Sequence, residues 1–171
     1  MAILPIRIYP DPVLRVKCRD VTEFDEKLRR TAADMVQTMH AAPGVGLAAP
    51  QVGVALQACV VEVGGNLYEL MNPRIVKAAG DERDLEGCLS LPGYYAYVTR
   101  REKVWVVAQN RLGKKIKVSG TGFLARAFQH ELDHLDGKPF IDYLESMDEL
   151  IPVGQGDEDD AEVREATSAL A

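Results

Sequence analysis

The sequence is poor in cysteine and in aromatic residues, and it has no long apolar run. It contains three cysteines, an odd number that argues against a disulfide framework, and aromatic residues make up 6% of the chain. The longest apolar run, residues 104–108, spans five residues, far fewer than the roughly 18 of a membrane-spanning helix. The first residues also lack the apolar stretch of a signal peptide. We therefore expect a cytoplasmic protein with no membrane contact.

Negative charge is concentrated near the C-terminal end. The 171-residue chain has a formal net charge of −6, of which residues 154–171 contribute −5, so that −1 remains for the rest. A nearly neutral body gives no electrostatic indication of direct nucleic-acid binding. The length suits a single domain. We expect one folded domain over residues 1–153, followed by an acidic, flexible tail over residues 154–171.

The hydrophobic pattern of the body predicts two helices and a series of short strands. Apolar residues recur at helical spacing over residues 25–41, and a second helix follows Thr121 and ends near Gly137. β-Branched and aromatic residues predict strands over residues 55–63, 67–71, 73–79, 94–99, 103–109 and 115–119. Trp105, in one of these strands, is expected in the core. Strands in series before a closing helix favour an α+β fold over repeated βαβ units.

The strongest local motif is H-E-x-x-H at residues 130–134, inside the second predicted helix. His130 and His134 are one helical turn apart on the same face, so both imidazoles can reach one metal ion. Glu131, beside the first of them, can reach a water on that ion as a general base. Two of the three histidines of the chain fall in this motif, which makes an incidental arrangement on a solvated helix improbable.

A catalytic metal centre of this type needs a third protein ligand and an open position. The long metzincin pattern is excluded because Phe140 stands where its last histidine would be. Glu145 and Glu149 follow the motif and are conceivable carboxylate ligands, although they lie close behind it in the sequence. The other candidate is a thiolate from Cys88, which glycines and a proline place in an expected exposed bend.

A third segment, residues 44–53, is rich in glycine and alanine. Gly44, Gly46 and Ala49 match the spacing of the dinucleotide fingerprint, but a predicted helix precedes them and Pro50 follows, whereas that fingerprint needs a strand before and a helix after. The alternative is a loop of small residues that lets the backbone approach a ligand closely. Gln51 can then offer its amide N–H to a developing negative charge.

Taken together and in this order, the segments 44–51, 86–90 and 130–134 resemble the three signatures of the bacterial and organellar peptide deformylases. The resemblance extends from about residue 8 to about residue 143, roughly four fifths of the chain. It implies an α+β fold with antiparallel or mixed sheets around a central helix that carries the metal site. It also implies that the domain over residues 1–153 is an amidase that removes the formyl group from the formyl-methionine of nascent polypeptides and releases formate.

The resemblance also implies the metal and the mechanism. Cys88, His130 and His134 would bind one divalent ion, with water as the fourth ligand. Fe(II) is the expected metal, and Ni(II), Co(II) or Zn(II) are expected substitutes. The resulting hydroxide would attack the formyl carbon, with Glu131 acting first as general base and then as general acid.

Further roles follow from the same resemblance. The Gln51 amide and the Leu89 backbone N–H would hold the oxyanion, and Asp133 and Gln129 are expected to orient the ligands. The backbone at two glycines is expected to pair with the peptide as an added strand. The methionine side chain would enter a pocket that His130 and three further side chains line. The glycines are Gly46 and Gly93, and the pocket residues are Val45, Tyr95 and Ala127.

Two departures from the family pattern concern partners. Some bacterial members carry a basic C-terminal helix that docks on the ribosome, whereas this chain has acidic residues at 154–171, so a transient ribosome contact would need another surface. Some members also have arginine where Tyr95 stands.

Two other classes fit the H-E-x-x-H motif taken alone. An endopeptidase would cleave internal bonds of an unformylated peptide, and a structural metal protein would need a fourth side-chain ligand.

Overall fold

The structure is a computed structural model that describes residues 2–153. Its sheet has the strand order β1-β2-β3-β4-β5, with β6 paired to β4, and all pairs are antiparallel. The strands are β1 (Gly46–Ala48), β2 (Ala58–Val63), β3 (Asn66–Cys88), β4 (Leu91–Gln109), β5 (Lys115–Thr121) and β6 (Ile151–Pro152). The α-helices are α1 (Glu26–Ala41) and α2 (Gly122–Leu135). Short 3-10 helices are η1 (Pro12–Arg15), η2 (Ala49–Val52), η3 (Phe140–Tyr143) and η4 (Met147–Glu149).

Both predicted helices are confirmed. Asp25 caps α1, because its side chain accepts a hydrogen bond from the Leu28 N–H at 2.9 Å. Gly137 follows the end of α2 with a φ of 72°, in the left-handed region that glycine adopts without strain. A Cβ atom there would lie 2.6 Å from the carbonyl oxygen of Arg15. Glycine at this position therefore fixes where α2 ends and lets the N-terminal segment cross it closely.

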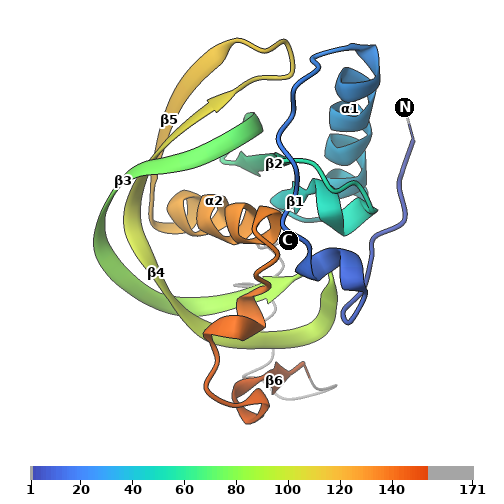
Figure 1. The fold of residues 1–171 in the computed structure, drawn as a ribbon. Coiled ribbons are helices and arrows are strands. Elements are labelled where there is room, and N and C mark those ends of the chain that lie inside the picture. Colours follow the sequence, from blue (N-terminus) through green and yellow to red (C-terminus); the bar gives the residue numbers. More distant parts are fainter. Residues whose placement is uncertain (1, 154–171) are drawn as a thin grey trace.

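The predicted short strands were wrong in their lengths. Residues 73–79 belong to the 23-residue strand β3, and residues 94–99 and 103–109 both belong to the 19-residue strand β4. Register shifts lie between Met71 and Arg74 and between Ile75 and Lys77, so β3 bends while staying paired to β4. Figure 1 shows the consequence, since β3, β4 and β5 curve around α2. The prediction of an α+β fold around a central helix is confirmed.

Two hydrophobic clusters meet at β2. Cys59 and Val61 pack in the cluster around α2, while Val60 packs in the cluster around α1. Alternation along β2 thus lets the strand support both helices from opposite faces. Phe128 of α2 is fully buried, and so is most of that helix, which brings the H-E-x-x-H motif into the interior of the domain.

Three further expectations concern Trp105, membrane-spanning helices and the C-terminal tail. Trp105 is half-buried on the outer face of β4 and alternates there with the buried residues Val104 and Val106, so placing it in the core was wrong. Within residues 2–153, neither α-helix is long and apolar enough to cross a membrane. The predicted acidic tail, residues 154–171, lies outside the described residues.

Candidate active site

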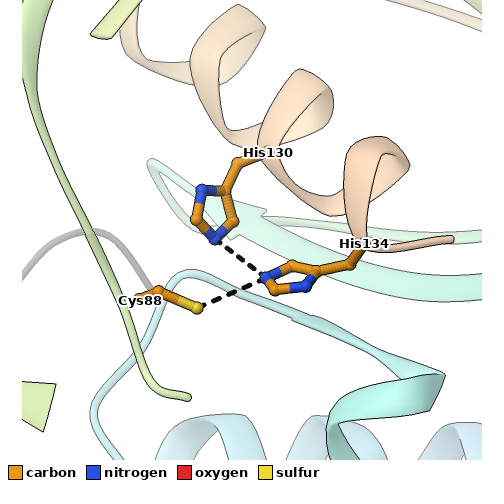
Figure 2. A group of neighbouring side chains, drawn as sticks. All are labelled: Cys88, His130 and His134. Atoms are coloured by element: carbon orange, nitrogen blue, oxygen red, sulfur yellow. Dashed lines mark hydrogen bonds between the residues drawn. The ribbon is translucent and has the colours of Figure 1, made fainter. Parts of the chain in front are cut away.

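Three potential metal ligands converge at the end of α2. Cys88 ends β3, and His130 and His134 come from successive turns of α2. His134 Nε2 lies 3.2 Å from His130 Nε2 and 3.3 Å from Cys88 Sγ, as Figure 2 shows. Their donor atoms all lie within 4.8 Å of one another. The expectation that Cys88 sits in an exposed bend was wrong, because its residue is only 8% exposed.

The donor spacing fits one tetrahedral ion. Nitrogen and sulfur ligands 2.0–2.3 Å from a metal ion at tetrahedral angles lie about 3.3–3.6 Å apart. Two of the donor distances, 3.2 and 3.3 Å, are close to this range. Burial lowers the pKa of His134 well below its usual value, which favours the neutral imidazole that binds metals. The chemistry and the spacing of these residues therefore suit a divalent transition metal.

Glu86 orients His130 from behind. It is fully buried, and its Oε2 lies 2.8 Å from His130 Nδ1, so Nε2 of that ring is left to face Cys88 and His134. Two arginines hold Glu86 in turn: Arg100 donates to both of its oxygens, at 3.0 and 2.6 Å, and Arg126 donates to Oε1 at 3.2 Å. Burial alone would raise the pKa of Glu86, but His130 and Arg100 lower it far below its usual value.

The sequence did not reveal this role of Glu86, and we expected Gln129 and Asp133 to orient the ligands instead. Gln129 does not contact the metal-site rings; its side chain bonds the backbone N–H and carbonyl of Arg101 and the Ala125 carbonyl. Asp133 pairs with Arg100 and accepts from Tyr143 at 2.6 Å. Among the described residues the direct contact with a ligand ring is made by Glu86, and Asp133 reaches it only through Arg100. The sequence shows only that Glu86 is two residues before Cys88, which does not indicate its partners on β4 and α2.

Glu131, next to His130 on α2, is also buried, and one of its carboxylate oxygens has no hydrogen-bond partner among the described residues. Its residue is 1% exposed, and its Oε2 has no hydrogen-bond partner among the described residues. Burial raises the pKa of this carboxyl to about 8. A carboxyl group with an unpartnered oxygen and a pKa near neutrality is suited to accept and release a proton.

Gly46, the first residue of β1, lies directly against Glu131. A Cβ atom at this position would lie 2.5 Å from Glu131 Oε1 and 2.9 Å from its Cδ. The sequence predicted a close approach of this backbone to a ligand; the close approach that the structure shows is to the Glu131 carboxylate, which occupies the space of a side chain.

We predict that Gly46→Ala displaces this carboxylate and lowers the free energy of unfolding by about 1–3 kcal/mol, the usual cost of overpacking. Turnover should fall with it. The control is the double variant Gly46→Ala/Glu131→Ala, measured by urea unfolding, in which the clash is absent and the loss of stability should vanish. If the loss persists in the double variant, the contact with Glu131 is not its cause.

Gln51 and Leu89 lie next to Cys88, one of the three potential metal ligands. Gln51 belongs to η2, is fully buried, and directs its side-chain N–H groups to Cys88 Sγ at 3.6 Å and Ser90 Oγ at 3.2 Å. Its Oε1 accepts from the Ala48 N–H at 2.9 Å, which fixes the orientation of the amide. Leu89 follows Cys88 directly in the turn between β3 and β4, and it is half-buried. The Gln51 amide is thus brought to the potential ligands, and Leu89 is next to one of them in the chain.

The residues predicted to contact the peptide are only partly brought together. Val45 and Ala127 pack in the same cluster around α2. Tyr95 alternates with the buried Ala96 along β4 and stands on the opposite face of that strand, so the structure separates it from Val45 and Ala127. Gly93 does not offer a free strand edge, because its carbonyl accepts from the Val153 N–H at 2.9 Å and β6 pairs beside it.

The remaining candidate ligands lie outside the cluster. Glu145 and Glu149 are exposed, and Glu149 Oε2 accepts from the backbone N–H groups of Glu145 and Ser146. Within the described part of the chain, the group of potential ligands that gathers at α2 is Cys88, His130 and His134. The structure therefore favours the cysteine over the downstream glutamates as the third donor.

A buried H-E-x-x-H helix with a third donor from a neighbouring strand is the arrangement of metal-dependent hydrolases. Comparison with known proteins makes the class specific. The family model described as polypeptide deformylase matches residues 3–149. The chain therefore belongs to the polypeptide deformylase family, enzymes that remove the N-formyl group from nascent peptides.

Individual relatives agree with this assignment. The chain is 51% identical over 170 residues to a peptide deformylase of Symbiobacterium thermophilum, covering 96% of this chain and 77% of that one. It is 51% identical over 146 residues to a peptide deformylase of Heliobacterium modesticaldum, covering 85% and 97%. The crystal structure of a peptide deformylase from Legionella pneumophila superposes with a TM-score of 0.83 at 41% identity, covering 96% and 92%.

Proposed function

We propose that this chain carries out the deformylation of its family with one ion held by Cys88, His130 and His134, and that Fe(II) is the native ion. The observation that supports this is the donor set: three buried donor atoms lie within 4.8 Å of one another, and two of their distances, 3.2 and 3.3 Å, are close to those around one tetrahedral ion. Ni(II), Co(II) and Zn(II) are the proposed substitutes, because a thiolate and two imidazoles suit all of these borderline ions. When bound, the ion supplies Lewis acidity at the formyl group and an acidified water.

Glu131 is the proposed proton carrier. Its Oε2 would take the proton of the attacking water and later give it to the amine nitrogen that leaves as the new N-terminus. Its burial and its lack of a partner support this role. The absence of a side chain at Gly46 leaves room for the carboxylate in this position.

Gln51 and Leu89 are the proposed donors to the oxyanion. The Gln51 amide is fixed by its bond from Ala48, so its N–H groups point to the cluster before any substrate arrives. The Leu89 N–H lies in the turn directly after Cys88. One donor of this kind is typically worth about 2.7–4 kcal/mol of transition-state stabilisation.

For the peptide we propose pairing at β1 and at the end of β3. β1 is at one end of the strand order, and the part of β3 after Arg74 pairs only with β4 among the described residues. Gly46 on β1 and Gly87 on β3 thus have one strand edge each that an extended peptide can join. Gly93, which was expected to pair with the peptide, and Tyr95, which was expected in the methionine pocket, keep a proposed role only at the entrance. Val45, Ala127 and His130 are the proposed lining of the methionine pocket.

The proposed context is the cytoplasm, where formyl-methionyl peptides emerge from the ribosome. Residues 1–153 are the proposed catalytic domain and residues 154–171 a proposed tail outside it. Since α2, η2, the end of β3 and the turn that follows it supply all the proposed catalytic groups, we propose that the reaction itself does not need the tail.

The test is formate release from a formyl-Met peptide by protein of known metal content. We expect turnover of the formyl-Met peptide with Fe(II) and no cleavage of the matched acetyl-Met peptide. The formyl carbon carries only a hydrogen atom, whereas the acetyl carbon carries a methyl group that a narrow site can exclude. Absence of formate from fully loaded protein would contradict the proposal. Cleavage of internal bonds in the unformylated peptide would instead indicate the endopeptidase alternative.

A further inference from the structure

The outer face of the curved sheet carries a strip of basic side chains. Buried Val104 and Val106 point to the core, so Lys103, Trp105 and their cross-strand partners point outward. The register of β3, β4 and β5 places further bases at outward positions of the same three strands. We define the outer basic face as Arg74, Lys77, Arg83, Arg101, Lys103, Lys115 and Lys117.

This face differs in charge from the rest of the chain. It holds seven basic side chains, and the one acid at an outward position of these paired segments is Asp81, which lies 3.7 Å from Arg101. The whole chain, in contrast, has a net charge of −6. The net charge of the chain therefore does not reveal this positive strip, which arises because the fold places seven bases on one face of the sheet. Six of the seven bases are exposed, and Lys103 is half-buried.

Aromatic rings hold part of this charge in place. The ammonium groups of Lys77 and Lys103 lie 4.6 and 4.8 Å from the centre of the Trp105 ring. The Arg83 guanidinium lies 4.8 Å from the ring centre of Tyr97, which is 45% exposed. Such cation–π contacts reduce the side-chain freedom that binding would otherwise have to remove. Three of the seven cations are thus held against rings on this face.

We propose that the outer basic face binds the phosphate backbone of RNA, without reading its sequence. Along β4, from Thr99 beside Arg83 to Gln109 beside Lys115, the strip runs for roughly 33 Å at 3.3–3.4 Å per residue. A row of separated cations matches a linear polyanion better than a single small anion. The family acts on nascent peptides, which emerge from a particle built largely of RNA, so an RNA-binding face would bring the enzyme to its substrate. The proposed active site is on the concave side, so both could be occupied together (Figure 1).

The experiment titrates the full-length, metal-loaded protein with poly(U) and follows the fluorescence of Trp105, the one tryptophan of the chain. For four or more phosphate contacts, the apparent affinity should fall about 50-fold or more between about 50 and about 200 mM salt. The double variant Lys77→Gln/Lys103→Gln should lower the slope of log affinity against log salt by about 1.4. Because both substitutions change the surroundings of Trp105, anisotropy of labelled poly(U) provides the comparison between variants.

The matched control is Lys27→Gln/Arg30→Gln, which removes the same charge from exposed positions on α1. It should leave the salt slope unchanged, and both double variants should release formate from a short formyl-Met peptide at the wild-type rate. Equal weakening by the two variants, or no binding of poly(U) at low salt, would overturn the proposal. Tighter binding to poly-glutamate or to phosphatidylserine vesicles than to poly(U) would also overturn it, in favour of an acidic protein or a membrane.

Discussion

Replacing Glu131 by alanine should lower kcat/KM for a formyl-Met peptide by about 10³–10⁴-fold while leaving the metal content unchanged. The reason for the loss is that Glu131 is the one carboxylate of α2 that is both buried beside the ligand cluster and left with an unpartnered oxygen. General acid–base catalysis of this kind contributes about 10²–10⁴-fold. Here one carboxylate would act both as the base that takes the proton of water and as the acid that protonates the leaving amine. The metal should stay because Glu131 is not among the three converging donors.

The same variant should be at least as stable as the wild type. A fully buried carboxyl group with an unpartnered oxygen destabilises the folded state, and burial raises its pKa to about 8. Removing it should therefore leave the free energy of unfolding unchanged or raise it, the opposite of most core truncations. The matched control is Glu131→Gln, which keeps the volume but cannot carry the proton. Turnover within tenfold of the wild type in either metal-loaded variant would contradict the role.

Local patterns in the sequence predicted the elements whose causes are local. The periodicity of α1 and α2 and the glycine at residue 137 are short-range signals, and both helices are confirmed. The i, i+4 spacing of His130 and His134 fixes their relation on one helix face, so that two of the three potential ligands followed from geometry. Cys88 was a candidate because of the glycines and the proline around it, and the structure brings it to the histidines.

The features that the sequence did not predict depend on contacts between residues that are far apart in the chain. Glu86 lies 14 residues from Arg100, 40 from Arg126 and 44 from His130 in the chain, so its role as their common partner has no local signature. β1 is a three-residue strand in a glycine-rich segment, and it forms because β2 pairs with it. The expectation of a buried Trp105 failed because a half-buried strand needs only one apolar face.

Replacing Glu86 by glutamine should produce the largest loss of stability, about 3–5 kcal/mol in the free energy of unfolding. The change removes the charge that pairs with Arg100 and Arg126, and both of these arginines are almost fully buried. Leaving buried charges without their partner has about this cost. The new amide N–H group would also face donors in place of an acceptor. In addition, His130 would lose the contact that orients its ring, so the affinity for metal should fall by about 10–100-fold.

The matched control is Asp142→Asn. Asp142 also pairs with an arginine at 2.6 Å, the same distance as between Arg100 Nη2 and Glu86 Oε2, but its side chain and that of Arg15 are 37% and 42% exposed. A solvent-exposed pair of this kind contributes about 0–1 kcal/mol, so urea unfolding should separate the two variants by at least about 2 kcal/mol. Similar losses in both would mean that distance rather than burial sets the strength of the pair. Since Asp142 does not touch His130, a metal titration should distinguish Glu86→Gln from this control even where both variants fold.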